Sequence, residues 1–245
     1  MEASKTIKSN IYSIVLFYSI AILLRYVVTK TTWIDITDNT FLKICLRGIG
    51  PTIGALIAFK VFGIKNTYSL AGKLKPILLS FIVFIVVPVL GFAIIGIKES
   101  ENVTVTSNIF IAGAKLSFYF FVYGILEEMG WRVFLQNQLD FLNQYIKYLI
   151  IGVLWFVWHL NFVLTTSNII FFFLLIFASW GIGKIGDKTK SVLAVGAFHT
   201  LYNLFSVDYF ESTNKLIVLA LSVMIWVSYI LFYDKVIKLM KIDNQ

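Results

Sequence analysis

Two adjacent glutamates, Glu127 and Glu128, have the greatest potential for chemistry in this chain, because they stand at the end of a long apolar run. The run covers residues 109–126 and has a single charged member, Lys115. A charged side chain near the centre of a bilayer costs ~3 kcal/mol even on a lenient insertion scale, so two carboxylates there need a purpose. Arg132 follows Glu128 by four residues, which is the favoured order for an ion pair on a helix. We expect this pair to neutralise Glu128 and to leave Glu127, about 100° round the helix, free for chemistry. An alternative is that the three charges are the solvated flanks of a helix end.

The two histidines of the chain, His159 and His199, both fall inside apolar segments. His199 and Asn203 are four residues apart and therefore share one face of a helix. Isolated polar groups in lipid would each stay unsatisfied, so two histidines, an asparagine and a glutamate pair need a shared cavity. Counted at ~1.5 Å per residue from the inner end of each segment, Glu127 lies near the start, His199 roughly 12 Å in and His159 roughly 15–20 Å in. His159 fits a shared depth least well.

The rest of the chain must supply the helices that hold these groups. Of its 245 residues, 59% are hydrophobic and 14% are charged, whereas a soluble domain carries roughly 25% charged residues. A spanning helix needs ~20 mostly apolar residues, and the sequence predicts an all-α membrane protein, a polytopic bundle of about eight transmembrane helices. Gly50 and Gly54 in the second span have a spacing that allows close helix contact. The predicted spans are 11–28, 41–64, 76–97, 109–127, 146–164, 168–183, 191–206 and 215–233.

The distribution of charge sets the expected organisation and location. No linker or repeat divides the chain, so we expect a single transmembrane domain over residues 1–245, whose last part, residues 234–245, is a short amphipathic helix or a frayed end on the cytoplasmic surface. Eight spans place both termini on one side, and the lysines gather in the loops on that side. We therefore expect a multi-pass protein of the cell membrane with cytoplasmic N- and C-termini. The net charge of +8 then reflects orientation in the bilayer, and we expect no nucleic-acid partner. The single cysteine, Cys45, excludes an intramolecular disulfide and a multi-cysteine metal site.

Three short motifs resemble those of the CAAX protease and bacteriocin-processing family of intramembrane proteases, which is also called CPBP or Abi. Glu127–Arg132 fits the motif Glu-Glu-x-x-x-Arg and has the Glu-Glu-x-Gly-Trp-Arg form of bacterial members. Trp155–His159 resembles the second motif, an aromatic residue four before a histidine, in which the family usually has Phe at the first position. His199–Asn203 fits the third, His-x-x-x-Asn. The three motifs occur in the family's order, use both histidines and indicate a catalytic core at about 109–206.

The resemblance implies hydrolysis of a peptide bond inside the membrane. The roles it implies are water activation by Glu127 and His159, with Glu127 as general base, and oxyanion stabilisation by His199 and Asn203. Glu128 would remain in its ion pair with the arginine and support the helix end. The chemistry is reasonable by itself, because carboxylates in apolar cavities are usable bases and side-chain donors at an oxyanion are commonly worth ~3 kcal/mol of barrier.

Metal dependence has two readings. The family is often labelled metalloprotease, and two histidines with a glutamate could hold zinc and leave one position open for water. In that alternative Glu127, His159 and His199 would be the ligands and Glu128 would be the base. We favour a metal-free mechanism with no cofactor, which predicts that activity survives exhaustive chelation.

The substrate is indicated only by class. A cavity in a bundle rich in Phe and Trp suggests an apolar or membrane-anchored peptide or protein. The resemblance implies a bacterial source, for which prenylated substrates are not expected and peptide maturation, bacteriocin self-immunity or surface regulation are candidate roles. Trp131 is a candidate for the substrate entrance or for an interfacial aromatic belt. The alternatives from other classes are a non-catalytic immunity or scaffold protein and a proton-coupled transporter, since intramembrane Glu and His also mark ion pathways.

Overall fold

The computed structural model describes residues 2–31, 34, 37–72, 74–83, 109–206 and 212–239. The regular elements among these residues are all helices and include no strand, so the predicted all-α class is confirmed for this part of the chain. The elements are α1 (Glu2–Lys30), α2 (Thr40–Phe62), α3 (Leu74–Phe81), α5 (Ile109–Glu128), the π-helix η3 (Met129–Gln136), α6 (Gln144–Trp158), α7 (Thr166–Thr189), α8 (Val192–Ser206) and α9 (Ser212–Leu239).

Local sequence signals set several of the helix ends. α2 begins after Asn39, whose side-chain oxygen accepts a hydrogen bond from the Leu42 backbone N–H. It ends at Gly63, which has the left-handed φ of 62° that a C-terminal cap favours. α7 begins in the same way after Thr165, whose hydroxyl accepts from the Asn168 backbone N–H. These caps satisfy backbone groups at the helix ends that have no partner within the helix.

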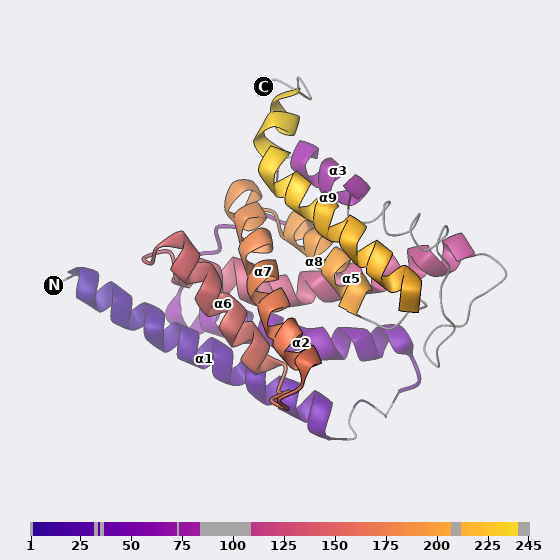
Figure 1. Ribbon diagram of the computed structural model, residues 1–245. Coiled ribbons are helices and arrows are strands. Elements are labelled where there is room, and N and C mark those ends of the chain that lie inside the picture. Colours follow the sequence, from indigo (N-terminus) through magenta and orange to yellow (C-terminus); the bar gives the residue numbers. More distant parts are fainter. Residues whose placement is uncertain are drawn as a thin grey trace.

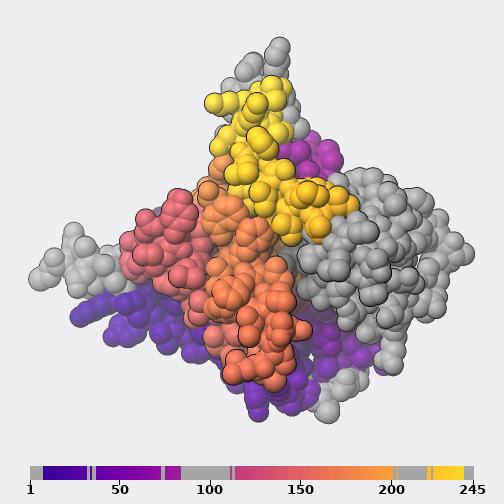
Figure 2. Space-filling model, viewed as in Figure 1, coloured from indigo at the N-terminus to yellow at the C-terminus, as the bar shows by residue number. Residues whose placement is uncertain are grey.

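The helices are arranged so that α5 lies in the interior of the bundle. It packs against α2 and α8, while α1 packs against α2 and α6 packs against α7. Figure 1 shows α1 and α6 along one edge of the molecule and α9 with α3 at the opposite edge. Figure 2 shows α7 crossing the middle of this face, between α6 and α9. The elements that carry the three motifs (α5 with η3, α6 and α8) are thus held by neighbours on several sides.

Small residues allow α1 and α2 to approach closely. A Cβ at Gly54 would lie 2.6 Å from the Phe17 carbonyl oxygen, and one at Gly50 would lie 3.1 Å from the Ala21 carbonyl oxygen. A side chain at Gly54 would therefore force the two helices apart. The close contact predicted from the spacing of these glycines is confirmed.

The described helices fit a membrane protein. Three of them, Lys8–Lys30, Thr40–Phe62 and Thr166–Thr189, are long and apolar enough to cross a bilayer, and Gln144–Trp158 is a shorter apolar helix. The predicted helical segments occur in the predicted order, and the count of eight spans stays a prediction. Of the predicted span 76–97, the part beyond residue 83 lies outside the described residues.

Three predicted boundaries differ from the structure. α6 ends at Trp158 rather than at residue 164, and α9 runs to Leu239 rather than to residue 233, so residues 234–239 are helical, as one of the two readings of this stretch expected. α5 does not stop at residue 127 but passes into η3, which ends at Gln136. The charges in this stretch find partners inside the bundle, so the helix need not end where they begin. Glu127 therefore lies roughly 14 Å inside the end of this continuous helix, which reduces its mismatch in depth with His159.

Candidate active site

The two glutamates stand where α5 passes into η3. Glu127 and Glu128 are the last two residues of α5, and the wider turns of η3 begin at Met129. π-helical turns are rare and are frequent at functional sites. The side chains from Gly130 to Gln136 are buried, so this segment runs through the interior. The alternative in which these charges are solvated flanks of a helix end is therefore wrong.

Glu128 has an ion-pair contact at one oxygen and a hydrogen bond at the other. Its Oε2 lies 3.2 Å from Arg132 Nε, the i,i+4 pair expected from the spacing. Its Oε1 lies 2.6 Å from Nδ1 of His199, which belongs to α8. All three side chains are buried, and Asn203, one helical turn after His199, is buried as well. Loss of either Glu128 or Arg132 would leave the other charge without its ion-pair partner in an apolar interior, so Glu128 has a structural role.

Glu127 is held by uncharged donors instead. Its Oε2 accepts hydrogen bonds from the indole Nε1 of Trp155, at 2.8 Å, and of Trp131, at 3.2 Å. Its other oxygen, Oε1, has no hydrogen-bond partner among the described residues, although the side chain is only 1% exposed. Oε1 is therefore the Glu127 oxygen that the indoles do not hold, and the Tyr123 side chain, one helical turn earlier, also interacts with this carboxylate.

His159 directly follows α6, and its ring is fixed by its own helix. Its Nδ1–H donates to the Trp155 carbonyl oxygen at 2.8 Å, which leaves Nε2 as the acceptor nitrogen of a neutral ring. The ring packs edge-to-face against Trp158 and Phe171, with centroid distances of 5.1 and 4.9 Å. The next residue, Leu160, has a φ of 55° and turns the chain away from the helix. The imidazole of His159 is thus oriented by the hydrogen bond of Nδ1, and Nε2 is the nitrogen that can accept a hydrogen bond.

Trp155 is the side chain around which the three motifs meet. Its ring centroid lies 5.0 Å from that of His199 and 6.3 Å from that of His159, while its indole N–H donates to Glu127. The guanidinium carbon of Arg132 lies 5.4 Å from the same ring. Among the described residues, no hydrogen bond joins His159 directly to Glu127. The structure therefore brings the predicted residues into one cluster, with the indole of Trp155 between them.

Two glycines set the distance between α5 and α8. A Cβ at Gly124 would lie 2.8 Å from the Gly196 carbonyl oxygen and 3.2 Å from His199 Cβ. A Cβ at Gly196 would lie 2.7 Å from Ile125 Cγ1. With glycine at both positions, α8 comes close enough for His199 to reach Glu128. Sequence reasoning missed both glycines, although each stands in one of the two motif helices.

The donor atoms as placed do not fit a metal ion. In the part of the chain that the structure describes, no three His, Cys, Asp or Glu side chains are grouped to hold one. The alternative ligand set was Glu127, His159 and His199. One oxygen of Glu127 is bound by two indoles, His159 Nδ1 by a backbone carbonyl, and His199 Nδ1 by Glu128. These hydrogen bonds leave Oε1 of Glu127 and Nε2 of both histidines as the atoms that a metal ion would need, so the spacing of the described side chains, and not their hydrogen bonds, is what argues against such a site.

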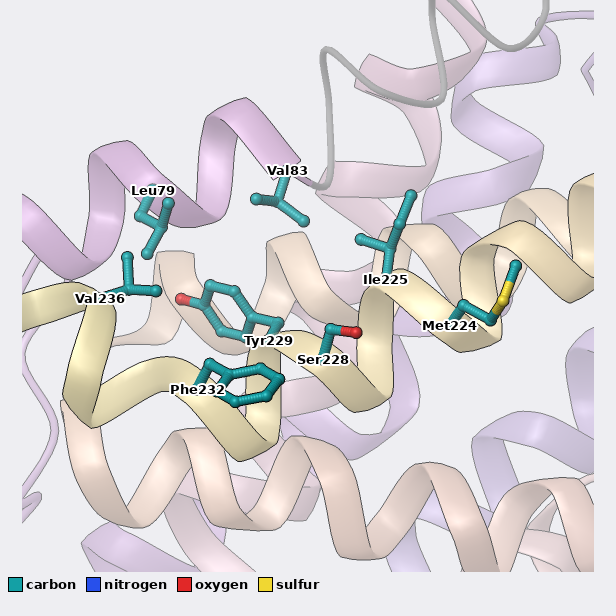
Figure 3. Close-up of a pocket in the computed structure, with 8 residues that line it drawn as sticks. All are labelled: Leu79, Val83, Met224, Ile225, Ser228, Tyr229, Phe232 and Val236. Atoms are coloured by element: carbon teal, nitrogen blue, oxygen red, sulfur yellow. The ribbon is translucent and has the colours of Figure 1, made fainter.

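An apolar pocket of about 500 Å³ lies elsewhere, between α3 and α9. Figure 3 shows that its walls are aliphatic and aromatic side chains, with the hydroxyls of Ser228 and Tyr229 as the polar groups. The Tyr229 hydroxyl is 3.1 Å from Ser80 Oγ and is thereby satisfied. None of the motif residues lines this pocket, so it is not the candidate active site.

The positions of two tryptophans differ from expectation. Trp131 is fully buried, so it belongs neither to an interfacial belt nor to an entrance in this structure. Its position four residues after Glu127 was a sequence signal for contact between the two side chains. Trp155 was expected only to fill the aromatic position of its motif, and its hydrogen bond to Glu127 crosses between helices, where spacing gives no signal.

Comparison with known families agrees with this geometry. A family model described as Type II CAAX prenyl endopeptidase Rce1-like matches residues 74–205. The match covers more than half of the chain and includes all three motifs. The chain therefore belongs to the Rce1-like CAAX protease family, and the family predicted from the motifs is confirmed. No curated protein matches the chain.

Proposed function

We propose that this member of the Rce1-like family is an intramembrane endopeptidase that hydrolyses a peptide bond with water activated by Glu127 and His159. The family implies a protease. The observation that carries the proposal is the Oε1 atom of Glu127, a buried carboxylate oxygen without a hydrogen-bond partner among the described residues. It belongs to the cluster that contains both histidines of the chain.

The first step of the proposed reaction is activation of water. Oε1 of Glu127 accepts one proton of a water molecule as the oxygen of that water attacks the carbonyl carbon of the peptide. Nε2 of His159, the acceptor nitrogen of its neutral ring, orients the water through the second proton. The proton held by Glu127 then passes to the leaving amine, which restores the carboxylate. A positioned carboxylate base of this kind contributes typically about 10²- to 10⁴-fold in rate.

The second group in the proposal stabilises the oxyanion that forms on the peptide oxygen. His199 donates Nδ1–H to Glu128, so Nε2 can donate to an oxyanion only when the ring is doubly protonated. Oε1 of Glu128 supplies the negative charge beside such an imidazolium, while Oε2 of the same carboxylate lies 3.2 Å from Arg132 Nε. The side-chain amide of Asn203, one turn later, is the second donor. Donors of this kind are worth about 3 kcal/mol of barrier each.

The setting of the site supports a substrate class and a location. The cluster is buried among tryptophan and phenylalanine side chains, which favours an apolar or membrane-anchored peptide or protein as substrate. Apolar helices and the family together indicate a membrane protein. We propose the cell membrane of a bacterium, with both termini cytoplasmic, and peptide maturation or bacteriocin self-immunity as the physiological setting. We propose no metal or other cofactor.

The test compares membranes that carry wild-type protein with membranes that carry Glu127→Ala, by mass spectrometry of released and retained peptides. Asp234→Ala is the matched control, because it also removes a carboxylate. Asp234 is exposed, pairs with Lys188 and lies outside the three motifs in sequence. We expect peptides that are cut by wild type and by Asp234→Ala but not by Glu127→Ala. Identical patterns at equal expression would overturn the proposal. Retained protection against a peptide toxin by Glu127→Ala would then identify an immunity protein, and counterflow in liposomes would identify a transporter.

A further inference from the structure

We propose that Trp155 and Trp131 are positioning residues that fix the Glu127 carboxylate so that Oε1 alone faces the reacting water. The inference rests on the proposed role of Glu127 as general base. It starts from one observation: the indole N–H groups of both tryptophans bind the same oxygen, Oε2, at 2.8 and 3.2 Å. The two indoles come from different elements, because Trp131 lies in η3 and Trp155 lies in α6.

Both indoles are held too firmly to follow a moving carboxylate. Trp131 is fully buried and packs edge-to-face against Phe17 and Trp158, with centroid distances of 5.8 Å to each. Trp155 is 1% exposed, with the His199 ring 5.0 Å away. Rings packed in this way cannot swing without displacing several neighbours, since protein interiors are close-packed. The two N–H directions are therefore fixed by the fold.

Two fixed donors on one oxygen have a directional consequence. A carboxylate on a glutamate side chain can rotate about its last bond and exchange its two oxygens. A partial rotation of the Glu127 carboxylate would break both indole hydrogen bonds at once, and a half-turn only exchanges two equivalent oxygens, so one oxygen always lies against the indoles and the other always occupies the unbound position of Oε1. The lone pairs that remain for proton transfer are then those of Oε1. Pre-set orientation of a reacting group is a large source of catalysis, and small misplacements have large effects on rate.

The indole donors also allow the Glu127 carboxylate to be ionised in this interior without a cation beside it. Glu128 next to it is paired with a cation, Arg132, and with His199. Among the described residues Glu127 has no such ion pair, and its donors are indoles, which supply hydrogen bonds but no charge. An ionised group buried without hydrogen bonds would be strongly unfavourable. The two tryptophans thus supply hydrogen bonds to the Glu127 carboxylate without neutralising its negative charge.

A third tryptophan provides a matched control. Trp158 is also fully buried and belongs to the same aromatic cluster, but its Nε1 donates to the Ala21 carbonyl oxygen at 3.0 Å. Replacement of any of these tryptophans by Phe keeps an aromatic ring and removes the N–H. Only the replacements at Trp131 and Trp155 remove a donor from Glu127. A difference between them and Trp158→Phe therefore reports on the donor rather than on packing.

The contact itself is tested without any activity measurement. Protein labelled with ¹⁵N-tryptophan in detergent micelles should give indole N–H signals from its six tryptophans, assigned with single Trp→Phe variants. We expect Glu127→Gln to shift the signals of Trp131 and Trp155 and to leave that of Trp158 in place. If neither of the first two signals moves relative to that of Trp158, the inference is overturned, whatever the protein does catalytically.

The role is tested by kinetics on a fluorogenic peptide that carries the sequence found to be cut by wild type but not by Glu127→Ala. We expect Trp155→Phe and Trp131→Phe to lower kcat by roughly 10- to 100-fold, with KM within about 2-fold of wild type. Trp158→Phe should keep kcat within about 3-fold. A Trp155→Phe variant with wild-type kcat would overturn the inference alone, since Glu127→Ala would still be inactive. Full cleavage by Glu127→Ala would instead remove the proposed function, and this inference with it.

Discussion

The adjacent glutamates should respond in opposite ways to the same substitution. Glu128→Gln removes the charge that pairs with Arg132 and the acceptor of His199 Nδ1–H, in a cluster with no exposure to solvent. Glu127→Gln removes a charge whose described neighbours are two indole N–H groups and the Tyr123 side chain, none of them charged, and an amide oxygen can still accept from the indoles. We therefore expect Glu128→Gln to lower stability and Glu127→Gln to lower activity while leaving stability close to that of wild type.

The magnitude for Glu128→Gln follows from its burial. Breaking a buried ion pair by removing one partner is destabilising by about 3–5 kcal/mol, because the other charge stays buried without compensation. For a chain of this size one kcal/mol corresponds to roughly 2–4 °C in Tm, so the fall in Tm should be on the order of 10 °C. For Glu127→Gln we expect less than about 1 kcal/mol in stability and a loss of about 10²- to 10⁴-fold in activity, the usual contribution of a general base.

A double variant separates charge from packing. Arg132→Met removes the cation, and on its own it should destabilise as Glu128→Gln does, because it leaves the carboxylate with only His199 as its partner. The combination Glu128→Gln/Arg132→Met removes both charges, and we expect it to recover most of the lost stability. Its activity should stay low, since His199 has then lost the carboxylate that holds it.

The measurements are thermal unfolding in detergent, followed by the monodisperse peak in size-exclusion chromatography, and cleavage by membranes at equal protein amount. The reasoning fails if Glu128→Gln unfolds at the wild-type temperature, or if the double variant is as unstable as the sum of the single variants. It also fails if Glu127→Gln keeps more than about a tenth of wild-type activity, because a general base contributes at least about a hundredfold.

Three further predictions concern metal, packing and the ion pairs of Lys147. Cleavage should persist within about 2-fold after exhaustive chelation, and activity that is lost on chelation and restored by zinc would instead favour the metal-dependent alternative. Gly130→Ala should lower stability by about 1–3 kcal/mol, since its Cβ would lie 2.8 Å from the Pro51 carbonyl oxygen; an unchanged Tm would contradict this. Lys147→Met should lower Tm because the buried ammonium binds Asp140 at 2.7 Å and Asp187 at 3.2 Å, and a fall of less than about 2 °C would show that these pairs add nothing.

The part of the site that sequence predicts well is the part that is local along a helix. The pairing of Glu128 with Arg132 follows from a spacing of four residues, and the same spacing joins Glu127 to Trp131. The contact of Glu128 with His199 is 71 positions apart in sequence, and it depends on two glycines that let α8 approach α5. No periodicity reports such a contact, because it is set by packing between helices.

The helix boundaries show the same limit in another form. Hydropathy predicted the helical segments in order, because apolar composition over a long window is a strong signal. From hydropathy we predicted that the helix with the first motif ends at residue 127, because a run of charges normally marks the membrane surface. In the structure η3 continues to Gln136, and Glu128 and Arg132 form their ion pair inside the bundle. Composition alone cannot distinguish a charge that is solvated from one that is paired by a distant helix.

The chemical difference between the two glutamates comes from what each one meets four residues later. Glu128 meets a guanidinium and is neutralised, whereas Glu127 meets an indole, which donates a hydrogen bond without adding charge. Both pairs begin in the last turn of α5 and end in the first turn of η3. One stretch of helix therefore holds a carboxylate in an ion pair beside the carboxylate for which we propose a catalytic role. The second indole, from Trp155, binds Glu127 from across the bundle and links it to the helix that His159 directly follows.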